Sequence, residues 1–235
     1  IQQFPNKKYF KNILENINNI ETIINNCLNA QYAINLDNRI KFMKTHSACW
    51  KTDKTTFTNF ENTLGVIHIV RDPRNVITSL KNHYNKKSYE NTLEFMKDEK
   101  KFIGSKNFEE EFDIPTLISS WSNHYKSWSK FDKNYLLVKY EDLIKDSKNE
   151  FMKITNYVKK ISNLELNANL DKIVDNCSFE NLRSQENQKG FIEAAKNRRF
   201  FFLGPRNNWK DVLDKKTQQD IEASFYNEMK ELNYL

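Results

Sequence analysis

The sequence predicts an α/β fold with a mostly parallel sheet. Three runs are predicted strands: 39–45, where apolar and polar residues alternate, and 65–70 and 135–139, which are rich in branched apolar residues. Segments with apolar residues at helical spacing lie before, between and after these runs. Strands separated by helices along a chain are typical of layered α/β folds with a mostly parallel sheet.

The helices follow from apolar spacing and capping residues. Apolar residues three and four positions apart predict one or two amphipathic helices over 8–30. Asp72 is a typical N-cap, and Pro73 a typical first residue, for a helix over 73–84. A helix is predicted over 116–131, where aromatic residues form a stripe that we interpret as core. Further predicted helices cover 89–103, 149–161, 168–176, 179–186 and 215–232.

The composition indicates a globular protein. Its 235 residues are enough for one large domain, so we expect a single domain over 1–235. Charged residues make up 29%, apolar residues 38% and aromatic residues 13%. The apolar runs are far shorter than the roughly 20 residues of a membrane-spanning helix, so no membrane span is expected. The sequence does not indicate an oligomeric state.

The formal net charge of +6 favours anionic partners. Lysines are scattered along the whole chain, often beside Glu or Asp, which is typical of a solvated surface. Aromatic residues lie at core spacing and are not interleaved with basic ones, so nucleic-acid binding is not expected.

The three cysteines, Cys27, Cys49 and Cys177, are far apart and lack CxxC spacing. Neither a disulfide framework nor a zinc site is expected, and this usage indicates a reducing compartment, so we expect a cytoplasmic protein. The chain begins at Ile1 rather than at Met, so the sequence makes no prediction about targeting.

Polar clusters follow the three predicted strands. They read Lys-Thr-His at 44–46, Arg-Asp-Pro-Arg at 71–74 and Lys-Tyr-Glu-Asp at 139–142. In open α/β sheets, ligands bind at the carboxyl ends of the strands. The three clusters are therefore the candidate functional residues.

Arg71 lies between a strand end and a helix start, which offers free N–H groups and a positive dipole. Its guanidinium presents a planar fork of donors that matches phosphate. Ser79 could add a hydroxyl from the helix, with Asn75 one turn before it on the same face. The alternative is a simple salt bridge between Arg71 and Asp72 beside the helix cap, and both interpretations remain open.

His46 lies where the first predicted strand becomes a loop. A histidine there can act as a general base near neutral pH. Lys44, two residues earlier, points to the same side and could stabilise developing negative charge. Taken alone, His46 is better interpreted as a satisfied polar residue than as a catalyst. We interpret His68 and His124 as structural.

Together, these clusters resemble the sulfotransferase family in order and spacing. The resemblance covers most of the chain from about residue 40 onward and is most specific in VRDPRNVITS (70–79) and VKYEDL (138–143). The segments KTH (44–46), CSFENL (177–182) and FLGPRNNWK (202–210) also match the family's order.

The resemblance implies a three-layer, P-loop-NTPase-like parallel sheet flanked by helices. It also implies transfer of a sulfuryl group from 3′-phosphoadenosine 5′-phosphosulfate (PAPS) to a hydroxyl or amine of a small-molecule acceptor. Adenosine 3′,5′-bisphosphate (PAP) would be the product, and no metal is implied.

The same resemblance assigns roles to individual residues. Arg71 and Ser79 match the family's positions that bind the 3′-phosphate of the donor, and His46 matches its catalytic base. Lys44 lies just before that base, beside the expected path of the sulfuryl group. Tyr140 falls in the segment close to the site.

The chain departs from the family pattern at its start. The family opens with a strand and a phosphate-binding loop of the type YPKSGTTW, whose lysine helps to hold the 5′-phosphosulfate, and the sequence contains no such loop. We therefore expect the first strand and this loop to lie upstream of residue 1. The 235-residue chain alone is then incomplete for activity.

A second departure lies in the C-terminal segment, which usually reads RKGxxGDWK in the family. Aligned on Trp209, the chain keeps Gly204, Trp209 and Lys210. It has Phe-Leu at 202–203 in place of Arg-Lys, and Asn-Asn at 207–208 in place of Gly-Asp.

Gly204 and Arg206 are the residues of this segment that we predict to bind the donor. Arg206 is one candidate for the positive charge that 202–203 lack, and the arginines at 198–199 are another. A plain surface role for each arginine is an equal alternative.

Two other functions remain open from the sequence. One is a catalytically inactive, sulfotransferase-like protein that keeps an anion or partner site. The other, less favoured, is a P-loop small-molecule kinase, which needs a phosphate loop and Mg²⁺ ligands, and no predicted strand ends in an obvious aspartate for that role. Loops at 47–64, 84–115 and 186–204 carry many aromatic residues, which predicts an apolar lining for the acceptor pocket.

Overall fold

The computed structural model describes residues 2–11, 13–14, 17, 19–104, 114–166, 169–191, 193–194 and 198–235. The chain divides into two compact units. Unit 1 consists of Ile1–Val66 and Asp98–Tyr135, and unit 2 consists of Ile67–Lys97 and Leu136–Leu235. A single domain over 1–235 stays a prediction.

Unit 1 contains helix α1 (Ile20–Asn35) and a cluster of aromatic side chains. The helix begins where the Asn19 side chain accepts a hydrogen bond from the Thr22 N–H at 2.8 Å. One face of α1 is buried and joins side chains from the rest of the unit. The core cluster consists of Phe4, Phe10, Ile23, Cys27, Ala30, Phe57, Ile114 and Trp128.

The strands of unit 1 are short. Strand β1 (Gln2–Gln3) pairs in parallel with β2 (Met43–Lys44). Strand β4 (Phe102–Ile103) pairs antiparallel with β5 (Thr116–Leu117). A 3-10 turn covers Lys7–Tyr9, and helix α4 covers Trp121–Ser129. The β2 strand ends two residues before His46, so it delivers that residue to a fixed place in the unit.

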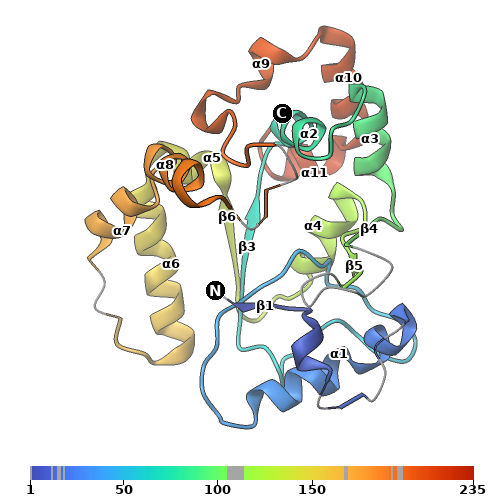
Figure 1. Cartoon of the computed structure of the whole chain (residues 1–235), viewed down its shortest axis with the longest axis vertical. Helices are drawn as coiled ribbons and strands as arrows, with labels where there is room; N and C mark the ends of the chain where they lie inside the picture. The colour runs from blue at the N-terminus through green and yellow to red at the C-terminus, as the bar shows by residue number, and fades with distance from the viewer. Residues whose placement is uncertain are drawn as a thin grey trace. The chain divides into compact units, whose positions relative to one another are not determined.

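Unit 2 is mostly helical and contains all but the first residue of two strands, each of which leads into a helix. Strands β3 (Val66–Val70) and β6 (Tyr135–Lys139) are hydrogen-bonded neighbours (Figure 1). Helix α2 (Pro73–His83) follows β3, and α5 (Tyr140–Lys145) follows β6. The other helices are α3 (Tyr89–Lys97), α6 (Ser147–Ser162), α7 (Leu170–Asn176), α8 (Phe179–Lys189), α9 (Trp209–Val212), α10 (Lys215–Ser224) and α11 (Tyr226–Glu231), with a 3-10 turn at Gly204–Arg206.

The C-terminal helices of unit 2 pack against α2. Helix α9 and helix α10 both contact α2, and α10 also contacts α3. Ile77, Ile221 and Met229 are fully buried, because the apolar faces of α2, α10 and α11 are covered. This packing holds the segment around Trp209 close to the helix that follows Arg71.

Several elements were predicted correctly. The strands predicted at 65–70 and 135–139 are β3 and β6, and the helix predicted at 73–84 is α2. The aromatic stripe is core, because Tyr125 and Trp128 are each 5% exposed.

Other predicted elements have different bounds. The strand expected at 39–45 is confined to Met43–Lys44, which are the residues that β1 pairs with. The helix expected at 89–103 ends at Lys97, because residues 102–103 pair with β5. The helix expected at 116–131 begins only at Trp121, where the Ser120 hydroxyl caps it by accepting from the Asn123 N–H.

The two ends of the chain also differ from prediction. Within 8–30, the α-helix begins at Ile20, while residues 12, 15, 16 and 18 of that prediction lie outside the described residues. The start of the helix predicted over 168–176 likewise falls on an undescribed residue. The helix expected at 215–232 is divided at Phe225, whose φ of −125° departs from helical geometry.

Among the described residues, no helix combines the length and the apolar character that crossing a membrane requires.

Candidate functional site

The turn from β3 into α2 places the first site residue. Asp72 caps the helix by accepting a hydrogen bond from the Arg74 N–H at 2.9 Å, and Pro73 is the first helical residue. The cap fixes the direction in which the chain leaves the strand. Arg71 is therefore held at the strand end, beside the first turn of the helix.

The Arg71 guanidinium makes two contacts in unit 2, and one of its N–H groups is left without a partner among the described residues. Its Nη1 donates to Ser79 Oγ at 3.3 Å, and its guanidinium lies 4.2 Å from the centre of the Tyr140 ring. Its Nε–H is buried and finds no hydrogen-bond partner within the part of the chain that is described. A buried donor without a partner is costly, and Arg cannot relieve this by losing its proton.

The environment of Arg71 is consistent with an anion site. Burial lowers the pKa of Arg71 from its ordinary value, while Tyr140, Glu141 and Asp72 act in the opposite direction. The guanidinium remains charged, because its ordinary pKa lies far above neutrality. An anion placed here would partner the Nε–H and compensate the desolvated charge.

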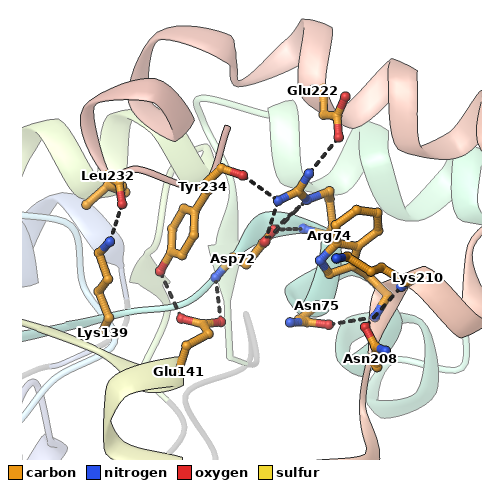
Figure 2. A network of polar contacts seen from close by, with 11 residues as sticks. Asp72, Arg74, Asn75, Lys139, Glu141, Asn208, Lys210, Glu222, Leu232 and Tyr234 are labelled. Carbon is orange, nitrogen blue, oxygen red and sulfur yellow. Dashed lines mark hydrogen bonds and ion pairs between the residues drawn. The ribbon is translucent and has the colours of Figure 1, made fainter. Parts of the chain in front are cut away.

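The salt bridge between Arg71 and Asp72, the alternative interpretation of this motif, does not form. Asp72 pairs instead with Arg74, whose Nη2 lies 2.7 Å from Asp72 Oδ2. Arg74 also contacts Glu222 at 2.6 Å and donates to the Tyr234 carbonyl at 2.7 Å (Figure 2). Its guanidinium stacks 3.9 Å from the Trp209 ring centre. The Asp72 carboxylate is thus committed to Arg74.

A second network joins the end of β6 to the C-terminus. Glu141 accepts from the Asp72 N–H at 3.0 Å through Oε1 and from the Tyr234 hydroxyl at 3.0 Å through Oε2 (Figure 2). Burial and the neighbouring Glu141 carboxylate raise the pKa of Tyr234, so its hydroxyl keeps the proton that it donates. Lys139 donates to the Leu232 carbonyl. The bond from the Asp72 N–H fixes the backbone directly after Arg71.

The C-terminal segment reaches α2 through asparagine side chains. The Trp209 N–H donates to Asn75 Oδ1 at 3.0 Å. The Asn207 amide nitrogen donates to the Asn75 carbonyl and to Ser79 Oγ, both at 3.1 Å, and Asn207 Oδ1 accepts from Thr78 Oγ1 at 2.7 Å. Asn207 is 6% exposed. Its side chain is therefore a buried link between the two segments that were predicted to form the site.

Gly204 and Arg206 lie in the same unit as Arg71. Gly204 has φ +55°, and a Cβ there would lie 2.3 Å from the Phe179 ring, so both conformation and space require glycine. The Arg206 side chain is exposed. Of the alternative arginines at 198–199, Arg198 donates to Asn85 Oδ1.

Lys44 and His46 lie in unit 1, and the residues after His46 are held firmly there. The Trp128 indole N–H donates to the Ser47 carbonyl at 2.9 Å. The Ala48 N–H donates to the Leu117 carbonyl at 2.9 Å. Because α4 and β5 both hold this segment, the position of His46 within unit 1 is well defined.

His124 on α4 is a neighbour of His46. Burial lowers the pKa of His124 to about 4, and a hydrogen bond to the backbone of His46 acts in the opposite direction. His124 is therefore neutral at physiological pH. It contributes to holding the backbone of His46 without adding a charge beside it.

The structure brings Arg71, Ser79 and Tyr140 together in unit 2, as the predicted site requires. Sequence reasoning missed the buried side chain of Asn207, which had been noted only as a departure from a motif. It also missed Glu141 as the acceptor of the Asp72 N–H, and Tyr234, which lies 93 residues from Glu141. No local pattern links residues so distant in the sequence.

The comparisons with known proteins agree on one family. The family model described as "Sulfotransferase domain" matches residues 2–233. Amine sulfotransferase of Oryctolagus cuniculus is 28% identical over 183 residues, which cover 72% of this chain and 56% of that protein. Sulfotransferase 2A1 of Homo sapiens is 24% identical, with 74% of this chain and 59% of that protein covered.

Solved structures show the same fold. Mouse sulfotransferase SULT7A1 complexed with PAP matches with a TM-score of 0.51 and 23% identity, over 71% of this chain and 58% of that chain. Retinol dehydratase in a complex with retinol and PAP matches with a TM-score of 0.59 and 20% identity, over 86% of this chain and 57% of that chain. The predicted α/β, P-loop-NTPase-like fold is thereby confirmed. The chain spans less than two thirds of the length of these relatives.

Proposed function

Because the chain belongs to the sulfotransferase domain family, we propose that the protein transfers a sulfuryl group from PAPS to a hydroxyl or amine of a small acceptor molecule. The observation that carries this proposal is the Arg71 guanidinium, with its buried and unpartnered Nε–H among the described residues and its Nη1 on Ser79. This donor set suits a phosphate, and the 3′-phosphate distinguishes PAPS and PAP from other adenosine nucleotides.

The residues of unit 2 would hold the nucleotide part of the donor. Arg71 supplies a fixed positive charge and a planar fork of N–H groups, which suits a phosphate dianion. Ser79 adds a hydroxyl from the second turn of α2, and Tyr140 keeps the guanidinium in place by stacking. Gly204 and Arg206 belong to the segment that approaches α2, and Arg206 adds long-range positive charge.

The residues of unit 1 would act on the acceptor. When bound, PAPS supplies the sulfuryl group, whose sulfur bonds to the acceptor oxygen or nitrogen as its bond to the 5′-phosphate oxygen breaks. His46 takes the proton that the acceptor atom loses, and Lys44 stabilises negative charge that develops along the transfer path. The electron pair of the broken bond leaves with PAP. Sulfuryl transfer of this kind requires that the side chains position the reactants and supply positive charge, and it requires no metal.

Aromatic side chains in unit 2 and the names of similar proteins support an apolar acceptor. Phe191, Phe200 and Phe201 form a cluster with ring centroids 4.6–5.2 Å apart. Similar proteins carry the names amine sulfotransferase and retinol dehydratase, so an apolar small molecule with an amine or hydroxyl is the proposed acceptor. We place the reaction in the cytoplasm, because the cysteines Cys27, Cys49 and Cys177 are all free thiols.

Titration calorimetry of the full-length protein with PAP and with adenosine 5′-monophosphate tests the donor site. We expect PAP to bind much more tightly, because only PAP carries the 3′-phosphate. Arg71→Ala should weaken PAP binding by more than about tenfold and leave adenosine 5′-monophosphate unchanged. Arg206→Ala, which removes an exposed charge of the same sign, should weaken it by only about two- to threefold. Equal affinities for the two nucleotides would contradict the proposal.

A further inference from the structure

We propose that Asn207 is a positioning residue, which aims the Ser79 hydroxyl proton at the anion that Arg71 binds. The inference rests on the proposed function, since the anion is the 3′-phosphate of the donor nucleotide. Asn207 occupies the position where the C-terminal motif of the family, RKGxxGDWK, has its second glycine, so this side chain is specific to the present chain. Ser79 and Asn207 are 128 residues apart in the sequence.

The first step is the orientation of the Asn207 amide. One end of the amide lies 3.1 Å from the Asn75 carbonyl oxygen, and a carbonyl oxygen can only accept hydrogen bonds. That end must therefore be the NH₂ group. The other end is then the carbonyl oxygen, which lies 2.7 Å from Thr78 Oγ1; the Asn75 carbonyl, 2.8 Å away, is the other acceptor in reach of the single Thr78 proton.

The second step is the role of Ser79. The NH₂ group of Asn207 has two protons; one goes to the Asn75 carbonyl and the other to Ser79 Oγ, also at 3.1 Å. The Arg71 guanidinium, which can only donate, lies 3.3 Å from the same oxygen. Ser79 Oγ thus accepts from two groups that have no acceptor capacity of their own.

The third step follows from the number of hydrogen bonds that a hydroxyl group can accept and donate. A serine oxygen has two lone pairs and one proton. With both lone pairs occupied by Asn207 and Arg71, the Ser79 proton must point away from both. Ser79 is exposed, so the position left for its proton is open to a ligand that also contacts Arg71. The hydroxyl is in effect converted into a fixed donor for an anion.

The burial of Asn207 fixes the orientation of its side chain and therefore the hydrogen bonds of Ser79. Its side chain is 6% exposed and each of its polar atoms has a partner, so it cannot rotate without leaving a buried group unsatisfied. Without Asn207, Ser79 could turn and donate its proton to other acceptors, and only part of the population would present the donor to an anion. Affinity for a 3′-phosphate should fall accordingly.

A double-mutant cycle on PAP affinity separates aiming from mere packing. We expect Asn207→Ala and Ser79→Ala each to weaken PAP binding by roughly five- to tenfold, the scale of one hydrogen bond to a charged group. The double variant should bind within about twofold of Ser79→Ala, because Asn207 acts only through Ser79. Adenosine 5′-monophosphate affinity should stay unchanged in all three variants.

The matched control is Asn208→Ala, which removes a neighbouring, exposed asparagine that caps α9 and contacts Asp211, not Ser79. It should leave PAP affinity within about twofold of the unchanged protein. The inference is overturned if Asn207→Ala weakens PAP binding equally with and without Ser79, or weakens adenosine 5′-monophosphate as much as PAP. That result would leave the proposed function standing, provided Arg71→Ala still abolishes the preference for PAP. If the unchanged protein shows no preference for PAP, both are wrong.

Discussion

Replacing Arg74 by methionine should destabilise the protein strongly, because it leaves the Asp72 carboxylate buried without its counter-charge. The side chains of the pair are only 7% and 6% exposed, and Arg74 donates to Asp72 through Nε at 3.0 Å and Nη2 at 2.7 Å. Removing one partner of such a pair costs about 3–5 kcal/mol. The stack on Trp209 and the bond to the Tyr234 carbonyl are lost at the same time.

Two further variants show whether the buried charge is the cause. Glu222 is the more exposed partner of Arg74, with 32% of its side chain accessible, so Glu222→Gln should cost less than about 1 kcal/mol. Adding Asp72→Asn to Arg74→Met should recover part of the loss, since Asn removes the uncompensated charge and still caps the helix. In urea unfolding followed by circular dichroism, a loss below about 1 kcal/mol for Arg74→Met would refute the reasoning. So would a double variant less stable than Arg74→Met alone.

Two more predictions concern unit 1. His46→Ala should abolish transfer of ³⁵S from labelled PAPS to an amine or hydroxyl acceptor. PAP affinity should stay within about threefold, because a base acts on the acceptor rather than on the nucleotide. Full activity in this variant would remove His46 from the mechanism. His124 has its pKa lowered to about 4 by burial, below the ordinary value of about 6.5, so the unfolded chain binds its proton first. Its contribution to stability is complete above pH 6.5 and falls by about 3 kcal/mol as the pH drops to 4. The pH dependence of unfolding should be correspondingly shallower in His124→Gln, and identical slopes would contradict the assignment.

Local patterns were sufficient for the parts of the fold that depend on neighbouring residues. The β-branched run before Arg71 and the Asp-Pro pair after it predicted β3, the cap and α2 with bounds within one residue. The aromatic stripe on α4 was predicted to be core for the same reason, since the spacing of buried side chains is a property of one helix. The family motifs then identified Arg71, Ser79 and Tyr140 as neighbours.

What failed depends on partners that are distant in the sequence. The strand expected at 39–45 alternates correctly, but only 43–44 find a partner, and that partner is β1, which is distant in sequence at the start of the chain. Asn207 appeared as a deviation from a motif, because nothing in its own segment shows that its amide meets α2. Composition and spacing cannot specify such a contact, since it is formed only when the chain is packed.

The choice of partner by Asp72 connects the stability of unit 2 with its binding chemistry. Asp72 stands between two arginines and could neutralise either one. It pairs with Arg74, which packing on Trp209 and hydrogen bonding to the C-terminal segment hold beneath the carboxylate. Arg71 is consequently left with a buried Nε–H and no ion pair among the described residues, on a backbone that the Glu141 bond to the Asp72 N–H keeps in place. A carboxylate that instead paired with Arg71 would compete with any phosphate, so the structural pair at Arg74 is what keeps Arg71 available for an anion.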